Sequence, residues 1–278
     1  MAARHRALRV YLAIGESTLE KLERRSALQA ELGDVLMART LVGALYATIL
    51  GETPGLEIAH LYEAAGEGAR VGGDLIDAYA YRNGDVSVLI ADIAGHGTLA
   101  AMHAAMIKYS VRAYASQTLL TDAVVRALNV AYMENCAFDN VESFASVFLA
   151  VFDVELRHLT YTNAGHELAL LVPAHGHAEL LAPNAPLVGV LKDETLFGID
   201  TISLMPGDML VLATDGISEA RSSTGELYGT ERFIEYTNRH RAEPAKRFAY
   251  GIVEEARQFS GGRAFRDDVA IVVLRVSA

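Results

Sequence analysis

Residues 204–220 read Leu-Met-Pro-Gly-Asp-Met-Leu-Val-Leu-Ala-Thr-Asp-Gly-Ile-Ser-Glu-Ala. The apolar part of this stretch, residues 209–214, has the length and composition of a buried strand. Asp215 stands where the backbone leaves the strand, and Gly216 lets a ligand or another part of the chain come close. A single Asp-Gly pair is usually an ordinary turn. This stretch therefore indicates a functional site only together with other stretches of the same kind.

Three other stretches place a carboxylate beside glycine or at the edge of a strand. They are Val71-Gly-Gly-Asp74, Ala91-Asp-Ile-Ala-Gly-His-Gly97 after an apolar strand at 85–91, and Asp267-Asp268 before a closing strand at 269–276. Two negative charges about 5 Å apart repel by roughly 3 kcal/mol at an effective dielectric near 20. Several carboxylates can therefore gather only with bound cations. All-oxygen ligands favour Mg²⁺ or Mn²⁺ over zinc, and a pair of such ions suits the hydrolysis of phosphate esters.

The rest of the chain from residue 56 onward alternates short strand patterns with helical ones. Further strands are expected at residues 57–62, 145–154, 159–162, 168–172 and 195–204. Helices are expected at residues 98–117, 121–136, 231–239 and 244–259. This order predicts a layered α+β domain.

The first 50 residues differ from the remainder, because they contain no proline and repeat leucine at helical spacing. Gly51-Glu-Thr-Pro-Gly55 then interrupts the helical pattern. The sequence thus divides into an N-terminal helical segment, 1–50, and a catalytic domain, 51–278. The helix either packs on its own domain or mediates dimerisation and signal transmission; its heptad pattern is too irregular for a coiled coil.

Composition excludes several classes of protein. Lys and Arg number 24 against 35 Asp and Glu, which gives a net charge of −11, so nucleic acid is a poor partner. Cys136 is the only cysteine, which excludes an intramolecular disulfide and disfavours a cysteine-based zinc site. The apolar stretch at 41–50 is too short to span a bilayer. We therefore expect a soluble cytoplasmic protein without a membrane span.

The ordered set of motifs resembles the metal-dependent protein phosphatases (the PPM family), in their bacterial SpoIIE/RsbU branch. The resemblance covers residues 56–275, and its other motifs are Phe144-Ala-Ser-Val-Phe-Leu-Ala-Val-Phe-Asp153, Tyr161-Thr-Asn-Ala-Gly-His166, Pro186-Leu-Val-Gly189 and Gly225-Glu-Leu-Tyr-Gly229. It implies a PPM-type β-sandwich of two antiparallel sheets flanked by α-helices, with an N-terminal helical extension. It also implies a site for two Mn²⁺ or Mg²⁺ ions at one end of the sandwich.

The resemblance assigns the metal ligands to the side chains of Asp74, Asp92, Asp215 and either Asp267 or Asp268, together with the backbone carbonyl of Ile93. Asp92 bridges the two ions, and Asp267 is favoured over Asp268. The implied reaction is direct in-line attack by a metal-bridging hydroxide, without a phosphoenzyme. Ala270 departs from the family pattern, which usually has Thr or Ser there, and this predicts weaker hydrogen bonding around the ligands.

Two further residues are candidates for the reaction. His96 either protonates the leaving seryl oxygen or only orients its loop. Arg70 either binds the substrate phosphate or is an ordinary surface residue.

The implied substrate is phosphoserine or phosphothreonine on a small regulatory protein, a STAS-type anti-anti-sigma factor. The implied pathway is partner switching in sigma-factor regulation and stress response. The N-terminal helix would receive an activating partner or form a homodimer. The alternatives are a catalytically silent phosphatase-like scaffold and a small-molecule phosphohydrolase, although all the metal aspartates are present and no Gly-x-x-x-x-Gly-Lys loop occurs.

Overall fold

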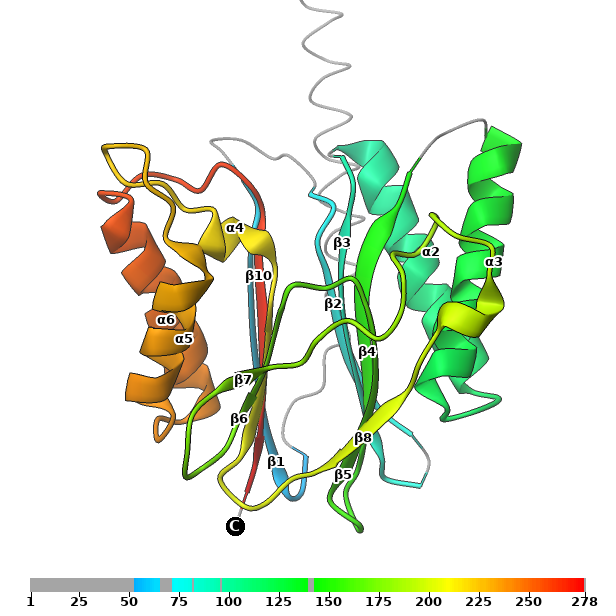
Figure 1. Cartoon of the computed structure of the whole chain (residues 1–278), viewed down its shortest axis with the longest axis horizontal. Helices are drawn as coiled ribbons and strands as arrows, with labels where there is room; N and C mark the ends of the chain where they lie inside the picture. Colours follow the sequence, from blue (N-terminus) through cyan, green and yellow to red (C-terminus); the bar gives the residue numbers. More distant parts are fainter. Residues whose placement is uncertain (1–52, 66–71, 82, 96, 140–142, 278) are drawn as a thin grey trace, which may run out of the picture.

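The computed structural model describes residues 53–65, 72–81, 83–95, 97–139 and 143–277. They form two five-stranded antiparallel sheets that pack face to face, with helices on both outer faces (Figure 1). The expected sandwich of the α+β class is thereby confirmed. The predicted helical segment 1–50 lies outside the described residues. Among the described helices, none combines the length and the apolar character needed to cross a bilayer.

The first sheet has the strand order β1-β10-β9-β6-β7. These strands are β1 (Leu56–Glu63), β10 (Val269–Val276), β9 (Met209–Ala213), β6 (Leu168–Val172) and β7 (Glu179–Leu180). The second sheet has the order β2-β3-β4-β5-β8. Its strands are β2 (Leu75–Ala80), β3 (Val86–Ile93), β4 (Ala145–Asp153), β5 (His158–Ala164) and β8 (Asp200–Ser203).

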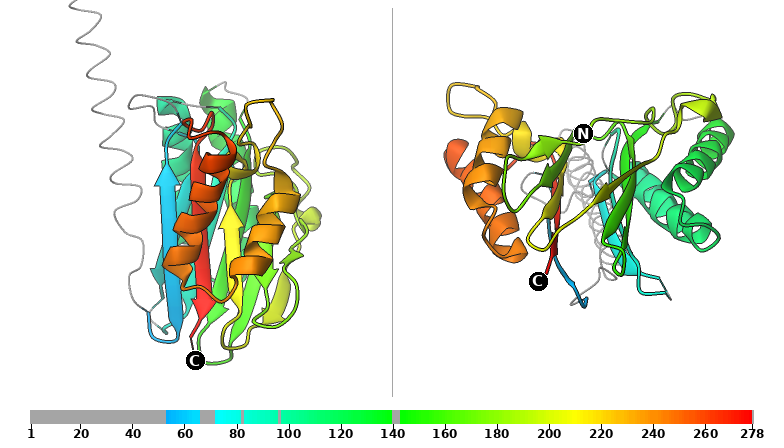
Figure 2. Two further views of the ribbon diagram at one scale, coloured as in Figure 1. Left: turned by 90° about the vertical axis from the view of Figure 1, so that its left-hand side faces the viewer. Right: turned by 60° about the horizontal axis from the view of Figure 1, so that its bottom comes forward.

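Helices cover the two outer faces and make a four-layered molecule, as the right-hand view in Figure 2 shows. The second sheet is covered by α2 (Thr98–Ala115) and α3 (Thr121–Asp139). The first sheet is covered by α4 (Asp215–Ser218), α5 (Gly229–His240) and α6 (Ala245–Phe259).

Strand β9 shows why the run at 209–213 is apolar without alternation. Leu210 and Leu212 point into the core between the two sheets. Val211 and Ala213 point the other way, into the core under α5 and α6. Both faces of the strand are therefore buried, and a strand buried on both faces needs apolar residues at every position.

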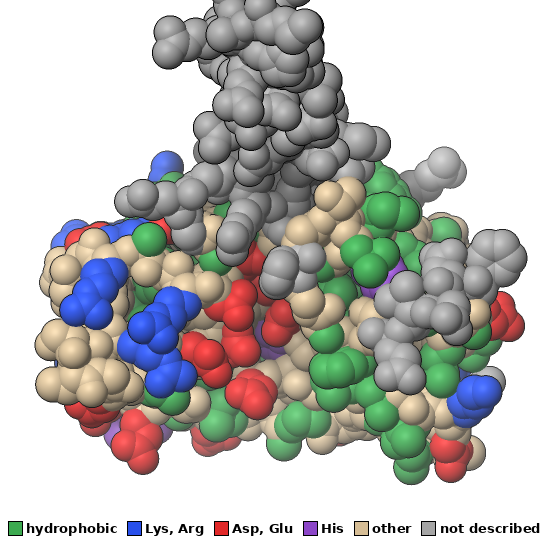
Figure 3. Space-filling model, turned by 90° about the horizontal axis from the view of Figure 1, so that it is seen from above, with side chains coloured by type: hydrophobic (Ala, Val, Ile, Leu, Met, Phe, Trp, Pro, Cys, Tyr) green, Lys and Arg blue, Asp and Glu red, His purple; other side chains and the backbone are tan. Residues whose placement is uncertain are grey.

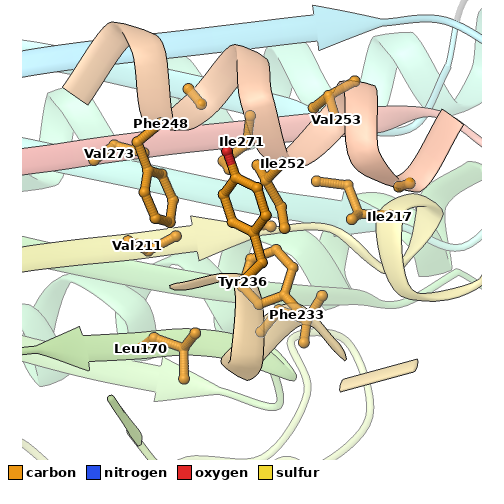
Figure 4. Packing of buried hydrophobic residues seen from close by; sticks show 14 of the residues in the cluster. Leu170, Val211, Ile217, Phe233, Tyr236, Phe248, Ile252, Val253, Ile271 and Val273 are labelled. Atoms are coloured by element: carbon orange, nitrogen blue, oxygen red, sulfur yellow. The ribbon is translucent and has the colours of Figure 1, made fainter. Parts of the chain in front are cut away.

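Helix α6 packs through the residues that recur at helical spacing along its sequence. Phe248, Ile252 and Val253 face the first sheet, where they meet residues such as Val211 and Val273 (Figure 4). Burying side chains of this size stabilises the fold by about 1.5–3 kcal/mol each. This packing holds the first sheet rigid beneath the loops that follow β9 and precede β10.

The strand expected at 195–204 is only partly correct. A 3-10 turn, η1 (Glu194–Leu196), occupies its beginning, and β8 is limited to Asp200–Ser203. The carboxylate of Asp193 accepts hydrogen bonds from the Thr195 amide at 3.0 Å and hydroxyl at 2.7 Å. These local bonds stabilise a turn in place of the strand ladder.

Candidate metal centre

The sheet topology gathers the four carboxylate stretches at one end of the sandwich. Asp74 precedes β2, and Asp92 lies near the end of the antiparallel neighbour β3, where Leu75 pairs with Ala91. Asp215 follows β9, and Asp267 and Asp268 precede the antiparallel neighbour β10. In an antiparallel pair one strand starts where its neighbour ends. All four stretches therefore meet at the upper end in Figure 1.

Acidic side chains gather in the middle of this end, as the view from above shows (Figure 3). A pocket of about 220 Å³ opens beside Asp92 and Asp215. Its walls include the apolar side chains of Phe144 and Leu187 and the carboxylate of Glu167. The site thus combines a group of carboxylates with a small, partly apolar pocket.

Asp74 is the most deeply buried of the expected aspartate ligands, with 5% of its surface exposed. The Thr214 hydroxyl donates a 2.6 Å hydrogen bond to Asp74 Oδ2 and accepts one from the Ala270 amide at 2.9 Å. Burial raises the pKa of Asp74 well above its usual range, and the charge of Asp92 adds to the increase. The Thr214 hydroxyl therefore holds this buried carboxylate in place.

Asp92 and Asp215 also hold their protons more tightly than ordinary aspartates. Burial, followed by the charge of Asp267, raises the pKa of Asp92 to about 6. Burial, followed by the charges of Asp92 and Asp267, raises the pKa of Asp215 to about 7. The same carboxylates thus repel one another in the metal-free fold, and a bound divalent cation would remove this repulsion.

The two adjacent aspartates before β10 have different surroundings. Asp268 is buried, and its Oδ1 accepts a 2.8 Å hydrogen bond from the Ala65 amide. Its carboxylate also lies so close to Gly72 that an added Cβ there would fall 1.4 Å from Oδ2. Asp267 is exposed, and its charge raises the pKa values of Asp92 and Asp215. Asp268 therefore holds the neighbouring loop, and the exposed Asp267 and the buried Asp268 both add negative charge to the acidic group.

The carbonyl of Ile93 faces the loop that carries Asp74. A Cβ added to Gly73 would lie 2.5 Å from the Ile93 oxygen, so only glycine permits this approach. The structure thus brings the Ile93 carbonyl next to the stretch that carries Asp74, as a shared metal site requires.

The donors fit hard divalent cations. Within the described ranges, no three Asp, Glu, His or Cys side chains form a ready-made metal cage. Mg²⁺ usually keeps several waters and binds only one or two carboxylates in addition to substrate phosphate. An all-oxygen set of separate carboxylates and one carbonyl suits Mg²⁺ or Mn²⁺ and does not suit zinc.

Glu167 is a carboxylate at this site that sequence reasoning missed. It lines the pocket, and its charge contributes to the raised pKa values of Asp92 and Asp215. The Asn163 side chain fixes the preceding turn, because it accepts from the His166 amide at 2.8 Å and donates to the His166 carbonyl at 3.0 Å. The Asn-Ala-Gly-His turn was the sequence signal that could have drawn attention to Glu167.

His166 lines the same pocket but is fully enclosed. Burial lowers its pKa to about 4, and its Nδ1 lies 3.1 Å from the Ser146 hydroxyl. The ring is therefore neutral near pH 7 and links the turn after β5 to β4, which suits a role in positioning the pocket wall.

Asp77 belongs to the same sequence motif as Asp74 but points away from the metal centre. It is fully buried against α2, where Arg112 Nε lies 2.7 Å and Lys108 Nζ 3.3 Å from its carboxylate. Asp77 thus anchors α2 to the second sheet. The candidates Arg70 and His96 lie outside the described residues.

The sequence of the chain is similar to those of several known proteins. The sequence model of stage II sporulation protein E (SpoIIE) matches residues 82–277. Protein IcfG of Synechocystis sp. is 29% identical over 189 residues, which is 59% of this chain and 30% of that protein. Phosphoserine phosphatase RsbU of Bacillus subtilis is 26% identical, over 68% of this chain and 55% of that protein. This chain thus spans less than two thirds of the length of each relative.

Solved structures share the fold at lower sequence identity. The SiaA-PP2C domain of Pseudomonas aeruginosa has a TM-score of 0.72 at 20% identity, covering 90% of this chain and 99% of that one. The RsbU and RsbW domains of a Mycobacterium tuberculosis protein give 0.71 at 23% identity, covering 84% and 64%. The catalytic domain of phosphatase PstP, in complex with two manganese ions, gives 0.58 at 17% identity, covering 80% and 100%.

Proposed function

The chain belongs to the SpoIIE family, and we propose that it is a metal-dependent protein phosphatase that hydrolyses phosphoserine or phosphothreonine on a regulatory protein. The observation that carries this proposal is the meeting of four carboxylate stretches, distant in sequence, at one end of the sandwich. The raised pKa values of Asp92 and Asp215 support it, because buried carboxylates that perturb one another in this way are typical of functional sites.

Two Mn²⁺ or Mg²⁺ ions would be held by Asp74, Asp92, Asp215, Asp267 and the Ile93 carbonyl. Such ions, when bound, supply a water of lowered pKa and neutralise charge on the phosphate. Asp268 is better suited to holding the loop of Gly72, since its carboxylate is enclosed there.

The other residues of the site position these groups and the substrate. The Thr214 hydroxyl orients Asp74. Phe144 and Leu187, on the walls of the pocket, would pack against the phosphoseryl side chain and exclude water. His96 and Arg70 remain the proposed proton donor for the leaving oxygen and the proposed phosphate ligand. Each lies four residues along the chain from a proposed metal ligand.

The proposed substrate is a phosphorylated STAS-type regulatory protein acting in partner switching in the cytoplasm. The relationship to a protein named phosphoserine phosphatase supports serine as the phosphorylated residue. The test compares phosphate release from a phosphoserine STAS protein and from 4-nitrophenyl phosphate, each with Mn²⁺ and with EDTA. We expect turnover of the phosphoprotein only with Mn²⁺. Turnover of 4-nitrophenyl phosphate alone would instead indicate a small-molecule phosphohydrolase. If neither substrate is turned over, the protein is a catalytically silent scaffold.

We also propose that the N-terminal segment, 1–50, receives an activating partner or forms a homodimer and so regulates the site. Its leucines at helical spacing support this role. Deleting residues 1–50 is expected to change the oligomeric state, measured by light scattering, or the rate of phosphate release. An unchanged oligomeric state and rate would contradict the proposal.

A further inference from the structure

A small hollow beside the acidic centre carries three arginine side chains. It has a volume of about 50 Å³, and its walls include Arg221, Arg263 and Arg266 together with Glu219 and Ser260. Figure 3 shows basic side chains next to the acidic group, on the side of the molecule where α4, α5 and α6 lie. We call this feature the arginine hollow.

Two of the three arginines lie close in the chain to proposed metal ligands. Arg266 directly precedes Asp267 in the chain, so their Cα atoms are about 3.8 Å apart. Arg221 follows Asp215 by six residues, just beyond the short helix α4. A substrate whose phosphate lies among the aspartates would therefore bring the residues next to its phosphoserine over the hollow.

Ordered backbone builds both sides of the hollow. On one side, Arg221 pairs with Leu227 in an antiparallel bridge, and the Tyr228 amide donates to the Ala220 carbonyl at 2.8 Å. On the other side, the Ser260 hydroxyl donates to the Arg257 carbonyl at 2.8 Å and reaches the Arg263 carbonyl at 3.5 Å. A preformed site loses less conformational entropy when a ligand binds.

Within the described part of the chain, no carboxylate forms an ion pair with the three guanidinium groups of Arg221, Arg263 and Arg266. The nearby Arg257, by contrast, pairs with Glu63 and stacks over an aromatic ring. Of the described residues on the walls of the hollow, Glu219 is the only one with a carboxylate. Positive charge therefore dominates on these walls although the whole chain carries −11.

We propose that the arginine hollow binds an acidic side chain of the phosphoprotein substrate, close to its phosphoserine; this inference rests on the proposed phosphatase function. Guanidinium groups bind carboxylates through paired, charge-assisted hydrogen bonds, and the volume suits one carboxylate group. A strongly acidic protein repels an acidic substrate at long range. A local positive surface beside the site offsets this repulsion and selects substrates with acidic residues next to the phosphoserine.

The test uses the full chain with Mn²⁺ and two phosphoserine peptides that differ only in Glu or Gln at the residues flanking the phosphoserine. The KM for phosphate release is measured, and peptide binding is followed separately by fluorescence anisotropy. We expect the wild-type protein to have the lower KM and the tighter binding for the Glu peptide. The double substitution Arg221→Gln with Arg263→Gln should raise the KM for the Glu peptide about ten-fold and abolish the preference.

Arg247→Gln is the matched control. Arg247 is an exposed arginine, with 77% of its side chain exposed, in the first turn of α6. This turn lies at the opposite end of the helix from the loop that carries Arg263. The Arg247→Gln protein should keep the wild-type preference for the Glu peptide.

Three results would overturn the inference. The first is equal binding and equal KM for both peptides in the wild-type protein. The second is an equal rise in KM for both peptides in the double variant. The third is that Arg247→Gln loses the preference for the Glu peptide as the double variant does. Preferential binding of the Glu peptide through the hollow without any phosphate release would support the inference and contradict the proposed phosphatase function. The two failures are therefore distinguishable.

Discussion

Thr214 joins the two sheets of the sandwich at the metal centre, because its hydroxyl donates a 2.6 Å hydrogen bond to the carboxylate of Asp74. Thr214 follows β9 of the first sheet, and Asp74 precedes β2 of the second. The hydroxyl also accepts a hydrogen bond from the Ala270 amide. Ala270, which stands where the family usually has Thr or Ser, thus contributes its backbone amide. Thr214 supplies the hydroxyl that binds the carboxylate of Asp74.

Replacing Thr214 with Val should weaken metal binding, because Asp74 loses the donor that orients it. Losing a partner of a metal ligand typically lowers metal affinity or activity by about 10–100-fold. The Mn²⁺ concentration for half-maximal phosphate release should rise by about that factor. The control is Thr160→Val, which removes a hydroxyl that bonds only near the surface, to Thr201. Equal Mn²⁺ requirements in the two variants would contradict the role of Thr214.

Asp267→Asn should change the Mn²⁺ requirement, whereas Asp268→Asn should change the stability of the metal-free protein. Asp267→Asn should raise the Mn²⁺ requirement at least about ten-fold without loss of metal-free stability, because its charge repels Asp92 and Asp215. Asp268→Asn should lower the free energy of unfolding in EDTA by about 1–3 kcal/mol. The buried carboxylate accepts hydrogen bonds from the backbone of Ala65, Gly73 and Asp74, and asparagine replaces one of its acceptor oxygens with a donor. Manganese titrations and urea unfolding measure the two effects. The reverse pattern would assign the ligand to Asp268.

The stabilisation of the fold by Mn²⁺ should grow as the pH rises. The pKa values of Asp92 and Asp215 are raised to about 6 and about 7, so the metal-free folded state keeps protons that the unfolded state loses above about pH 4. Their contribution to the free energy of unfolding therefore falls as the pH rises through this range. A bound cation removes this loss, so the difference in Tm between samples with Mn²⁺ and with EDTA should increase from about pH 5 to about pH 8.

His166 acts in the opposite direction, because burial lowers its pKa to about 4. The contribution of His166 to the free energy of unfolding is lost as the pH falls below about 6.5. This contribution is the same with Mn²⁺ and with EDTA, so it cancels in the difference in Tm between the two samples. The Asp92→Asn, Asp215→Asn double variant should show a much smaller increase with pH. A difference in Tm that does not change with pH in the wild-type protein would contradict the proposed carboxylate repulsion.

Asp77→Ala should destabilise the protein by about 3–5 kcal/mol, since it removes the carboxylate that pairs with Lys108 and Arg112 at a fully buried position. Urea unfolding followed by circular dichroism measures the effect. Asp122→Ala is the control, because the pair of Asp122 with Arg126 is partly exposed and should contribute less than about 1 kcal/mol. A similar decrease in the free energy of unfolding in both variants would show that Asp77 does not anchor α2.

The positions of the carboxylates could be predicted from the sequence for a physical reason. Each stretch couples a strand to a carboxylate at its end, and antiparallel neighbours bring a strand start next to a strand end. The apolar run at 209–213 likewise indicated a strand. The structure shows that both faces of this strand are buried, in the two cores around Leu210 and Val211.

Contacts between distant segments could not be predicted in this way. Thr214 and Asp74 are 140 residues apart, and neither position alone indicates a hydrogen bond. Asp77 lies three residues from Asp74, but alternation along β2 turns its side chain towards α2. The arginine hollow combines loops before α5 and after α6, so its charges are scattered in the sequence.

The most direct test of the metal centre is phosphate release from a phosphoserine STAS protein by the full chain with Mn²⁺, compared with EDTA and with Asp92→Asn and Asp215→Asn. Asp193→Asn serves as the control, because Asp193 is exposed and only caps the turn η1. We expect EDTA and each of the two site substitutions to lower the rate by at least about 100-fold, while Asp193→Asn keeps the wild-type rate. Undiminished release in EDTA, or in both site variants, would contradict a carboxylate-held metal centre as the site of the reaction.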